Sequence, residues 1–289
     1  MRIKPQALRS ISDTALLVAY HRAMESQRPD ALFKDEFAVK LTETRGEQIA
    51  RSLFYSRSIA WSTIVRTVLI DDIVRRLVAA GVDGVINLAA GLDARPYRLP
   101  LPASLRWIEI DLPDLVREKN EALAAETPAC RLERIALDLT DAEKRRELFV
   151  RLASESQDAL VLSEGLLMYL PPAVVGEVAD DLHAQCSFRR WATDLATPAV
   201  KQRVNRWWGR KLKRAQTHYQ FAPAEGAKFF EPHGWCEAEF YPMIDHGIRL
   251  NRAMRGLWIL ELMERVAPKS AARMREKWRI GVVLLEQTQ

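Results

Sequence analysis

The first eighty residues carry apolar side chains at helical spacing. Between residues 59 and 80, apolar and charged positions recur so that one face of a helix should pack against a core. The Ser-Asp-Thr sequence at 12–14 predicts the N-cap of a first helix, which the turn signal at 28–30 ends. A short second helix is expected over 35–41. This part of the chain is therefore predicted to be entirely helical.

After residue 80, short apolar runs alternate with amphipathic stretches. The runs predict five strands, at 84–88, 105–110, 132–137, 158–163 and 188–194. The stretches between them predict helices at 113–125, 141–153 and 172–185. Strands and helices in this rhythm are typical of a doubly wound, mostly parallel sheet.

The last third of the chain leaves this rhythm. It predicts a helix over 199–215, a strand over 235–241, helices over 253–265 and 268–278, and a final strand over 280–285. We therefore expect one α/β domain with a seven-stranded sheet that ends in antiparallel strands. Its expected parts are a helical cover (1–80), a cofactor-binding core (82–195), a capping insertion (196–234) and a C-terminal part that completes the sheet (235–289).

Composition narrows the class of protein. The 289 residues are 48% hydrophobic, enough for a large core, and the net charge is +5. This mild excess suits an anionic partner but is common in enzymes, so nucleic-acid binding is not favoured. Three sparse cysteines point to a reducing cytoplasm rather than a disulfide framework. No apolar stretch approaches the roughly 18 residues of a membrane span, so no membrane role is expected.

A strand followed by a small-residue turn is the most informative local pattern. The apolar run at 85–88 ends in Ala89-Ala90-Gly91, and Asp93 follows. A dinucleotide-binding turn needs three glycines, whereas only Gly91 is present here, and an acid beside a pyrophosphate would repel it. The turn therefore disfavours NAD and FAD and favours a cofactor with a cationic end, such as S-adenosylmethionine.

Acidic residues follow three consecutive predicted strands. Asp111, Asp138 and Glu164 each come at or just after the carboxyl end of a strand. Ligands of open α/β sheets bind at this edge, so the three carboxylates should meet there. Asp111 could accept hydrogen bonds from ribose hydroxyls, Asp138 from an adenine amine, and Glu164 could face a cationic group. Any one of them could instead cap a helix, but the three together favour a nucleoside cofactor.

The segment at 87–99, N-L-A-A-G-L-D-A-R-P-Y-R-L, resembles the N-L-G-A-G-L-D-T-R-x-x-R-L segment of the leucine carboxyl methyltransferase family. Blocks at 13–23, 66–72 and 164–170 are similar to three further segments of that family. The resemblance covers roughly residues 12–172. It implies a class I methyltransferase fold and an S-adenosylmethionine-dependent O-methyltransferase.

The resemblance also implies roles for single residues. Arg66 would pair the methionine carboxylate, Asp111 would hold the ribose, and Glu164 would lie near the cofactor's amino group. The full set of expected cofactor-binding residues is Arg66, Ala89, Gly91, Asp111, Leu112, Asp138, Leu139 and Glu164. Ala89 departs from the family's glycine. Its β-carbon could weaken cofactor binding, which keeps open a binding module without catalysis.

The acceptor is expected to be a small molecule of secondary metabolism, methylated on a carboxylate or a hydroxyl. A hydroxyl needs a general base, whereas a carboxylate does not. The candidates for acceptor-side chemistry are His218, Tyr219 and Tyr241, with His233 as a further candidate, although a structural role is the favoured interpretation for each. His233 and Cys236 alone are too few ligands for a metal site, and no metal is expected.

The predicted helix over 199–215 is strongly basic and carries two tryptophans. Its charged residues are Lys201, Arg203, Arg206, Arg210, Lys211, Lys213 and Arg214, beside Trp207 and Trp208. A solvated helix with one tryptophan turned inward is the favoured interpretation. The alternatives are a lid that attracts an anionic acceptor and a contact with nucleic acid, which would suit methylation of RNA or protein. The oligomeric state stays open.

Overall fold

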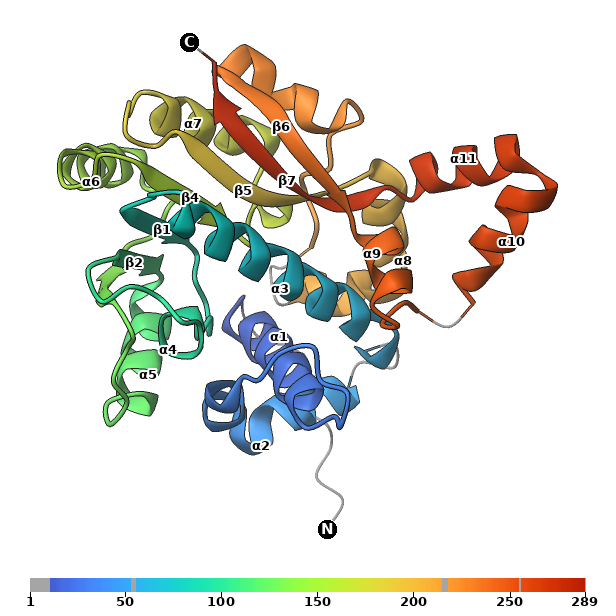
Figure 1. Cartoon of the computed structure of the whole chain (residues 1–289), viewed down its shortest axis with the longest axis horizontal. Coiled ribbons are helices and arrows are strands. Elements are labelled where there is room, and N and C mark those ends of the chain that lie inside the picture. The colour runs from blue at the N-terminus through green and yellow to red at the C-terminus, as the bar shows by residue number, and fades with distance from the viewer. Residues whose placement is uncertain (1–10, 53–55, 215–217, 255, 289) are drawn as a thin grey trace.

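The computed structural model describes residues 11–52, 56–214, 218–254 and 256–288, and these form a seven-stranded sheet with helices on both faces (Figure 1). The strands are β1 (Gly84–Leu88), β2 (Arg106–Asp111), β3 (Arg131–Ala136), β4 (Ala159–Ser163), β5 (Arg190–Ala196), β6 (Trp235–Pro242) and β7 (Ile280–Gln287). Their order in the sheet is β3-β2-β1-β4-β5-β7-β6.

The first five strands run parallel, and β7 pairs antiparallel with both β5 and β6. This arrangement confirms the expected α/β class and the antiparallel finish. Strand order reverses between β1 and β4, because the chain goes outward through β2 and β3 before it returns. Such a reversal opens a crevice at the carboxyl ends of the two central strands.

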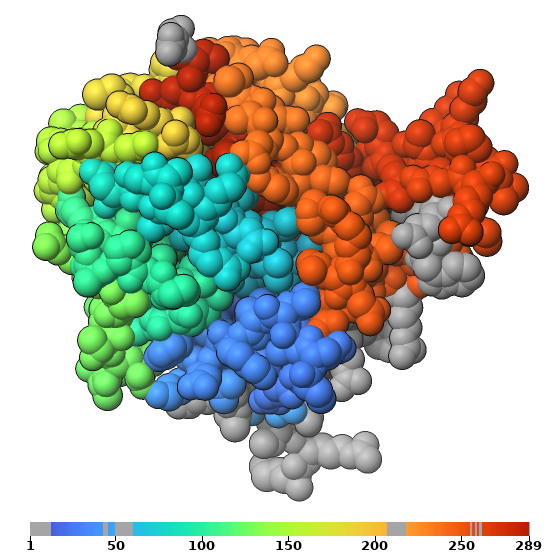
Figure 2. All heavy atoms as spheres, viewed as in Figure 1, coloured from blue at the N-terminus to red at the C-terminus, as the bar shows by residue number. Residues whose placement is uncertain are grey.

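Three helices precede the sheet: α1 (Ile11–Ser26), α2 (Glu36–Ser52) and α3 (Ser56–Ala79). The helices between the parallel strands are α4 (Arg95–Arg98), α5 (Pro113–Ala122), α6 (Ala142–Ser154) and α7 (Pro172–His183). Those of the last third are α8 (Pro198–Arg214), α9 (Met243–Arg249), α10 (Trp258–Val266) and α11 (Pro268–Lys277), with 3-10 helices at Leu167–Tyr169 and Gly226–His233. In Figure 2, α10 and α11 stand out from the body.

Some predicted element boundaries were wrong. The residues expected as an N-cap, 12–14, lie inside the first turn of α1, and α2 runs eleven residues beyond the predicted end of that helix. The helix predicted over 253–265 begins only at Trp258. Gly256 lies just before it with φ of +95°, a backbone conformation that an α-helix cannot contain. Before this break the chain forms α9, which the sequence pattern did not predict.

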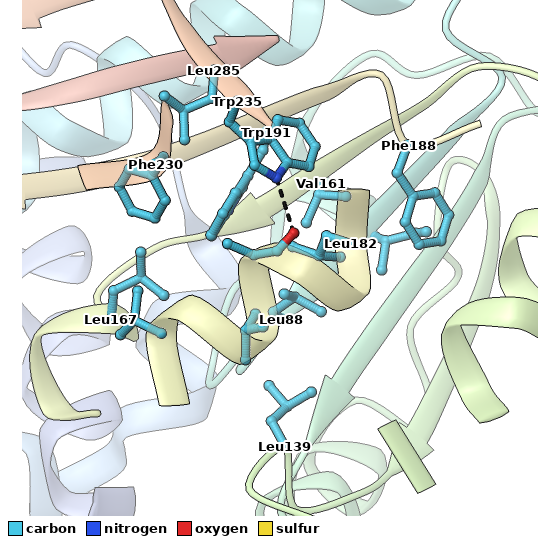
Figure 3. Close-up of a cluster of buried hydrophobic side chains, with 14 of the residues drawn as sticks. Leu88, Leu139, Val161, Leu167, Leu182, Phe188, Trp191, Phe230, Trp235 and Leu285 are labelled. Atoms are coloured by element: carbon cyan, nitrogen blue, oxygen red, sulfur yellow. Dashed lines mark hydrogen bonds between the residues drawn. The ribbon is translucent and has the colours of Figure 1, made fainter. Parts of the chain in front are cut away.

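Aromatic side chains fasten the C-terminal strands to the parallel core. Trp191 of β5 is fully buried and meets Phe230 and Trp235 edge-on, at ring-centroid distances of 5.2 and 5.6 Å (Figure 3). Its indole N–H donates to Ser163 Oγ of β4 at 2.8 Å. Burying a tryptophan together with its N–H partner stabilises one packing arrangement over others. The late strands are thus part of the same core.

A buried ion pair holds α1 against the segment that follows α9. Arg252 donates through Nε to both carboxylate oxygens of Glu25, each at 3.0 Å, and through Nη2 to Oε1 at 2.9 Å. Both side chains are buried. The same guanidinium reaches Asp30 beyond the end of α1. The N-terminal cover is therefore fixed to the C-terminal third of the molecule.

Across the described ranges, the structure has no helix that is both long and apolar enough to cross a bilayer. Cys130, Cys186 and Cys236 are free thiols.

Candidate functional site

A cavity of about 410 Å³ opens where the strand order reverses. Its floor is the turn after β1 together with the carboxyl ends of β2, β3 and β4. Helices α1 and α3 form one wall, and residues 168–171 and 219–220 form another. Its volume lies within the roughly 300–1,000 Å³ of small-molecule sites.

All eight residues expected to bind the cofactor line this one cavity. They are Arg66, Ala89, Gly91, Asp111, Leu112, Asp138, Leu139 and Glu164. They come from five separate segments, which only the folded sheet brings together. The roles assigned to each residue remain predictions, but their convergence is a property of the structure.

The turn after β1 has two residues in the left-handed region. Ala89 has φ of +51° and Gly91 has φ of +52°. Glycine adopts this conformation freely, whereas alanine is strained there by roughly 1–2 kcal/mol. Ala89 therefore keeps the backbone shape that a glycine would adopt, at a cost in stability, and places a methyl group on the cavity wall.

Asp111 is oriented by the backbone of this turn and of its own strand end. Its two carboxylate oxygens accept hydrogen bonds from Gly91 N–H at 2.6 Å and Leu112 N–H at 2.7 Å. Burial raises the pKa of Asp111, and these two bonds offset part of that rise. The side chain is thus held at the cavity with lone pairs left for further donors.

Asp93, whose charge was taken to favour a cofactor with a cationic end, lines the cavity and is itself paired. Its carboxylate accepts from Asn87 Nδ2 at 2.9 Å, from the Arg95 backbone N–H at 2.9 Å and from Arg95 Nη1 at 2.8 Å. Burial opposes ionisation, but the charge of Arg95 together with those of Lys119, Arg22 and Arg98 outweighs it and holds the pKa of Asp93 well below its usual range. An adjacent guanidinium therefore compensates its charge.

Arg66 and Glu164 were predicted to meet the carboxylate and the amino group of the cofactor's methionine end, and they also pair with each other. Arg66 Nε donates to Glu164 Oε1 at 3.0 Å, and Arg66 Nη1 donates to Asp194 Oδ2 at 2.8 Å. Glu164 Oε2 accepts from Arg95 Nη1 at 2.8 Å. Despite burial, these carboxylates raise the pKa of Arg66, and the guanidiniums lower that of Glu164.

The sequence analysis missed Asp194, although a signal for it existed. It lies in β5, near the carboxyl end of that strand, and its Oδ1 accepts from Gly165 N–H at 2.6 Å. The strand-end rule that singled out Asp111 and Glu164 applies equally to Asp194. The ion pair with Arg66 could not be foreseen, because 128 residues separate the two.

This ion-pair network continues away from the cavity. Arg95 Nε donates to Asp71 at 2.7 Å, Arg98 donates to the same carboxylate at 2.6 and 2.7 Å, and Arg22 Nε donates to Asp35 at 2.8 Å. Among the described residues the network holds four guanidiniums (Arg22, Arg66, Arg95 and Arg98) and five carboxylates (Asp35, Asp71, Asp93, Glu164 and Asp194). One negative charge is therefore left over beside the cavity, which favours a cation.

Of the acceptor-side candidates, the structure brings only Tyr219 to the cavity. Its ring meets that of Tyr169 edge-on, with 5.4 Å between centroids. Burial raises the pKa of both phenols, that of Tyr219 well above 10, so both hydroxyls are neutral at physiological pH.

The other candidates lie outside the cavity lining. His218 does not line it, and its Nδ1 is buried without a hydrogen-bond partner. Tyr241 lies on β6, where its hydroxyl accepts from Arg76 at 3.0 Å and donates to Glu239. His233 pairs with Asp180 of α7 at 2.7 Å. Position in the C-terminal half of the sequence therefore did not predict proximity to the cavity.

A histidine from the N-terminal cover lines the cavity instead. His21 of α1 is only 3% exposed, and its Nδ1 lies 3.5 Å from Thr63 Oγ1 of α3. Burial lowers its pKa to about 4, so the imidazole is neutral at pH 7. Its position within the N-terminal block that resembles the family was the available signal.

The first turn of the basic helix α8 lies close to the wall formed by residues 168–171 and 219–220. Lys201 Nζ donates to the backbone oxygen of Gln220 at 2.6 Å, and the Arg203 guanidinium lies over the ring of Trp278 at 4.9 Å. The side chains of Trp207, Trp208, Arg210, Lys211, Lys213 and Arg214, on which the lid hypothesis depends, lie outside the described residues. In the part that is described, no group of three or more His, Cys, Asp or Glu residues is arranged to hold a metal ion.

Known proteins are similar to this chain in sequence and in fold. The model of the leucine carboxyl methyltransferase family matches residues 15–183. A protein of Mycobacteroides abscessus, provisionally named an S-adenosyl-L-methionine-dependent methyltransferase, is 35% identical over 176 residues, which are 56% of this chain and 57% of that protein. This chain thus matches little more than half of that relative.

A Mycobacterium tuberculosis protein with the same provisional name is 32% identical over 257 residues, covering 78% of this chain and 80% of its own. The crystal structure of a DUF574 family protein from Streptomyces avermitilis superimposes with a TM-score of 0.58 at 12% identity, covering 98% of this chain and all of that one. This second likeness supports the fold alone. The family match spans more than half of the sequence, and the chain belongs to the leucine carboxyl methyltransferase family.

Proposed function

We propose that this protein is an S-adenosylmethionine-dependent methyltransferase that methylates an oxygen of a small molecule, a carboxylate or a hydroxyl, in secondary metabolism in the cytoplasm. The observation that carries the proposal is the convergence of the eight expected cofactor-binding residues on one cavity at the reversal of strand order. The family membership and the names of the relatives support it.

The residues of the cavity fit the cofactor chemically. Asp111 has lone pairs beyond those used by Gly91 and Leu112, and these suit ribose hydroxyls. Asp138, whose Oδ1 accepts from the Thr140 backbone and hydroxyl, would meet the adenine amine. The excess negative charge of the network suits a sulfonium and an ammonium group.

Arg66 would hold the methionine carboxylate in spite of its two ion pairs. A guanidinium has five N–H donors, and Nε and Nη1 account for the bonds to Glu164 and Asp194. These carboxylates fix the plane of the guanidinium, so little side-chain entropy would be lost when a third anion binds.

When bound, S-adenosylmethionine supplies the activated methyl group. The chain contributes position and electrostatics: Asp111 and Arg66 anchor the two ends, and α1 and α3 cover the cavity and restrict the access of water. Holding both reactants in line replaces a bimolecular encounter with an oriented one.

The conformation of Ala89 supports a second candidate, a module that binds the cofactor without catalysis. A strained residue with a methyl group on the cavity wall could hold the methyl donor out of line. Both candidates predict that the cofactor binds, but only the methyltransferase predicts turnover.

Isothermal titration with S-adenosylmethionine and S-adenosylhomocysteine tests the proposal. Both should bind, and Asp111→Asn should weaken both by about 10- to 100-fold, the effect of losing a charged hydrogen-bond partner. Tyr241→Phe, far from the cavity, serves as the matched control. Absence of binding by either compound at high micromolar concentration would refute the proposal. Binding without product across a broad acceptor panel would support the module.

A further inference from the structure

The charged lining of the cavity is predominantly negative. Among the described residues that line it, the cationic side chains are those of Arg22 and Arg66. The anionic side chains are those of Asp93, Asp111, Asp138 and Glu164. Arg95 and Arg66 compensate Asp93 and Glu164, whereas Asp111 and Asp138 have no ion pair among the described residues. An anion that entered this cavity would therefore leave water without gaining an unpaired cation.

Both cations already have partners. Arg22 donates through Nε to Asp35 at 2.8 Å and through Nη2 to the backbone oxygen of Leu92 at 2.5 Å. Arg66 is bound to Glu164 and Asp194, and its remaining donors are the ones that the cofactor's carboxylate would use. No described cation of the lining is therefore left for a second carboxylate.

Apart from Arg22 and Arg66, the side chains that the N-terminal cover and residues 168–171 and 219–220 contribute to the lining are apolar or neutral. The apolar ones include Leu17, Val18, Met168, Leu170 and Pro171. The neutral polar ones include His21, Thr63, Tyr169 and Tyr219. Burial keeps the imidazole and both phenols uncharged near pH 7. Such a lining matches a molecule with an apolar body and an uncharged polar group.

We propose that the acceptor is an uncharged hydroxyl compound with an apolar body, rather than a carboxylate, and that His21 receives its hydroxyl. This inference rests on the proposed function and specifies its substrate class. It departs from the carboxyl acceptor that the name of the family suggests, and it assigns a role to a residue of α1 that the sequence analysis had not singled out.

His21 supplies what a hydroxyl acceptor needs and a carboxylate does not. In the transfer, the acceptor oxygen forms a bond to the methyl carbon while the carbon–sulfur bond breaks and its electron pair stays on sulfur. The hydroxyl proton passes to the neutral imidazole of His21, which releases it to solvent. The products are a methyl ether, a neutral thioether and one proton, so charge and atoms balance. A neutral imidazole can accept this proton, whereas a protonated one cannot; because burial also disfavours the imidazolium, the proton is held only in passing and moves on to solvent.

Binding to the unmodified protein tests the substrate class without requiring turnover. The probes are three pairs with similar apolar bodies: phenol and benzoate, 2-naphthol and 2-naphthoate, and decanol and decanoate. Each is titrated into the protein saturated with S-adenosylhomocysteine at pH 7. We expect the hydroxyl member of at least one pair to bind at least about tenfold more tightly, a difference of about 1.4 kcal/mol. Equal or tighter binding of the carboxylates, or binding of none of the probes, would overturn the inference.

Two histidine variants test the role of His21. With the hydroxyl compound that binds best, His21→Asn should lower kcat about 100-fold or more, as expected for loss of a general base, while KM changes little. The affinity for S-adenosylhomocysteine should stay the same, which shows that the variant is folded. His233→Asn, outside the cavity, is the matched control and should match the parent protein. An unchanged kcat in His21→Asn would overturn the assignment.

These outcomes are separable from those of the proposed function. Loss of cofactor binding in the parent protein contradicts the methyltransferase itself. Intact cofactor binding with a preference for carboxylate probes contradicts only the substrate class.

Discussion

Replacing Arg95 with Met removes the guanidinium at the centre of the network beside the cavity. Arg95 is only 2% exposed and donates to three carboxylates, those of Asp71, Asp93 and Glu164, at 2.7, 2.8 and 2.8 Å. Met preserves much of the volume of the side chain but no charge and no donor. The change therefore leaves three buried acids short of a partner.

The expected loss of stability is large. Removing one partner of a buried ion pair costs about 3–5 kcal/mol, because the remaining charge stays buried without compensation. A typical domain is stable by only about 5–15 kcal/mol. We therefore expect Arg95→Met to fold with a melting temperature lowered by on the order of 10 °C.

The loss should depend on pH in a defined direction. In the parent protein the pKa values of Asp93 and Glu164 are lowered, so their ionisation stabilises the folded state. This contribution is present above their pKa values in the unfolded chain, about 4, and is lost as pH falls further. Without Arg95, one cation fewer opposes the burial of Asp93, so its pKa should rise, and that of Glu164, which keeps Arg66, should rise less. Protonation on going from pH 7 to pH 5 should then relieve the variant, and the difference in unfolding free energy between variant and parent should shrink.

Urea unfolding at pH 7 and pH 5, followed by tryptophan fluorescence, measures both effects. The matched control is Arg117→Met, because Arg117 pairs with Asp114 at 2.8 Å with both side chains more than 60% exposed, and its loss should change stability little. A loss below about 1 kcal/mol for Arg95→Met, or one that is equal at the two pH values, would refute the electrostatic account.

Three further substitutions test the turn and the cavity wall. Ala89→Gly relieves roughly 1–2 kcal/mol of backbone strain, but it also gives the unfolded state more conformational freedom, which costs about 0.4–1 kcal/mol. The free energy of unfolding in urea should therefore rise by up to about 1 kcal/mol. A clear fall would contradict the strain. Gly165→Ala should lower the free energy of unfolding by about 1–2 kcal/mol, because φ of Gly165 is +67° and the new β-carbon would lie 3.4 Å from Arg66 Nη1. An unchanged urea midpoint would show that the turn adapts. Tyr241→Phe should leave the affinity for S-adenosylhomocysteine, measured by titration, at the parent value, and a marked loss would mean that β6 is coupled to the cavity.

Much of the fold follows from local patterns in the sequence. The strand at 84–88 was predicted with its observed bounds, because a short apolar run between Gly81 and a small-residue turn has few other interpretations. The meeting of Asp111, Asp138 and Glu164 at one cavity follows from the rule that parallel strands share a carboxyl edge. These predictions need only local periodicity and one topological rule.

What could not be predicted depends on distant pairing. The partners of Arg66 lie 98 and 128 residues away, and no local pattern marks which acid a guanidinium will meet. Tyr241 was selected as a polar residue of the C-terminal half, yet its strand places it beside Arg76. The contribution of His21 depends on how α1 packs against α3, which periodicity does not determine.

The ion pair between Glu25 and Arg252 also orders events during synthesis. The two residues are 227 positions apart, so α1 leaves the ribosome long before its partner exists. Until the last third of the chain emerges, the Glu25 carboxylate lacks Arg252 and has only the Leu32 N–H and the half-exposed Arg28 as partners, so burial of α1 is disfavoured. The helix that carries His21 is therefore fixed last. The nascent chain can complete its central strands before the cavity closes.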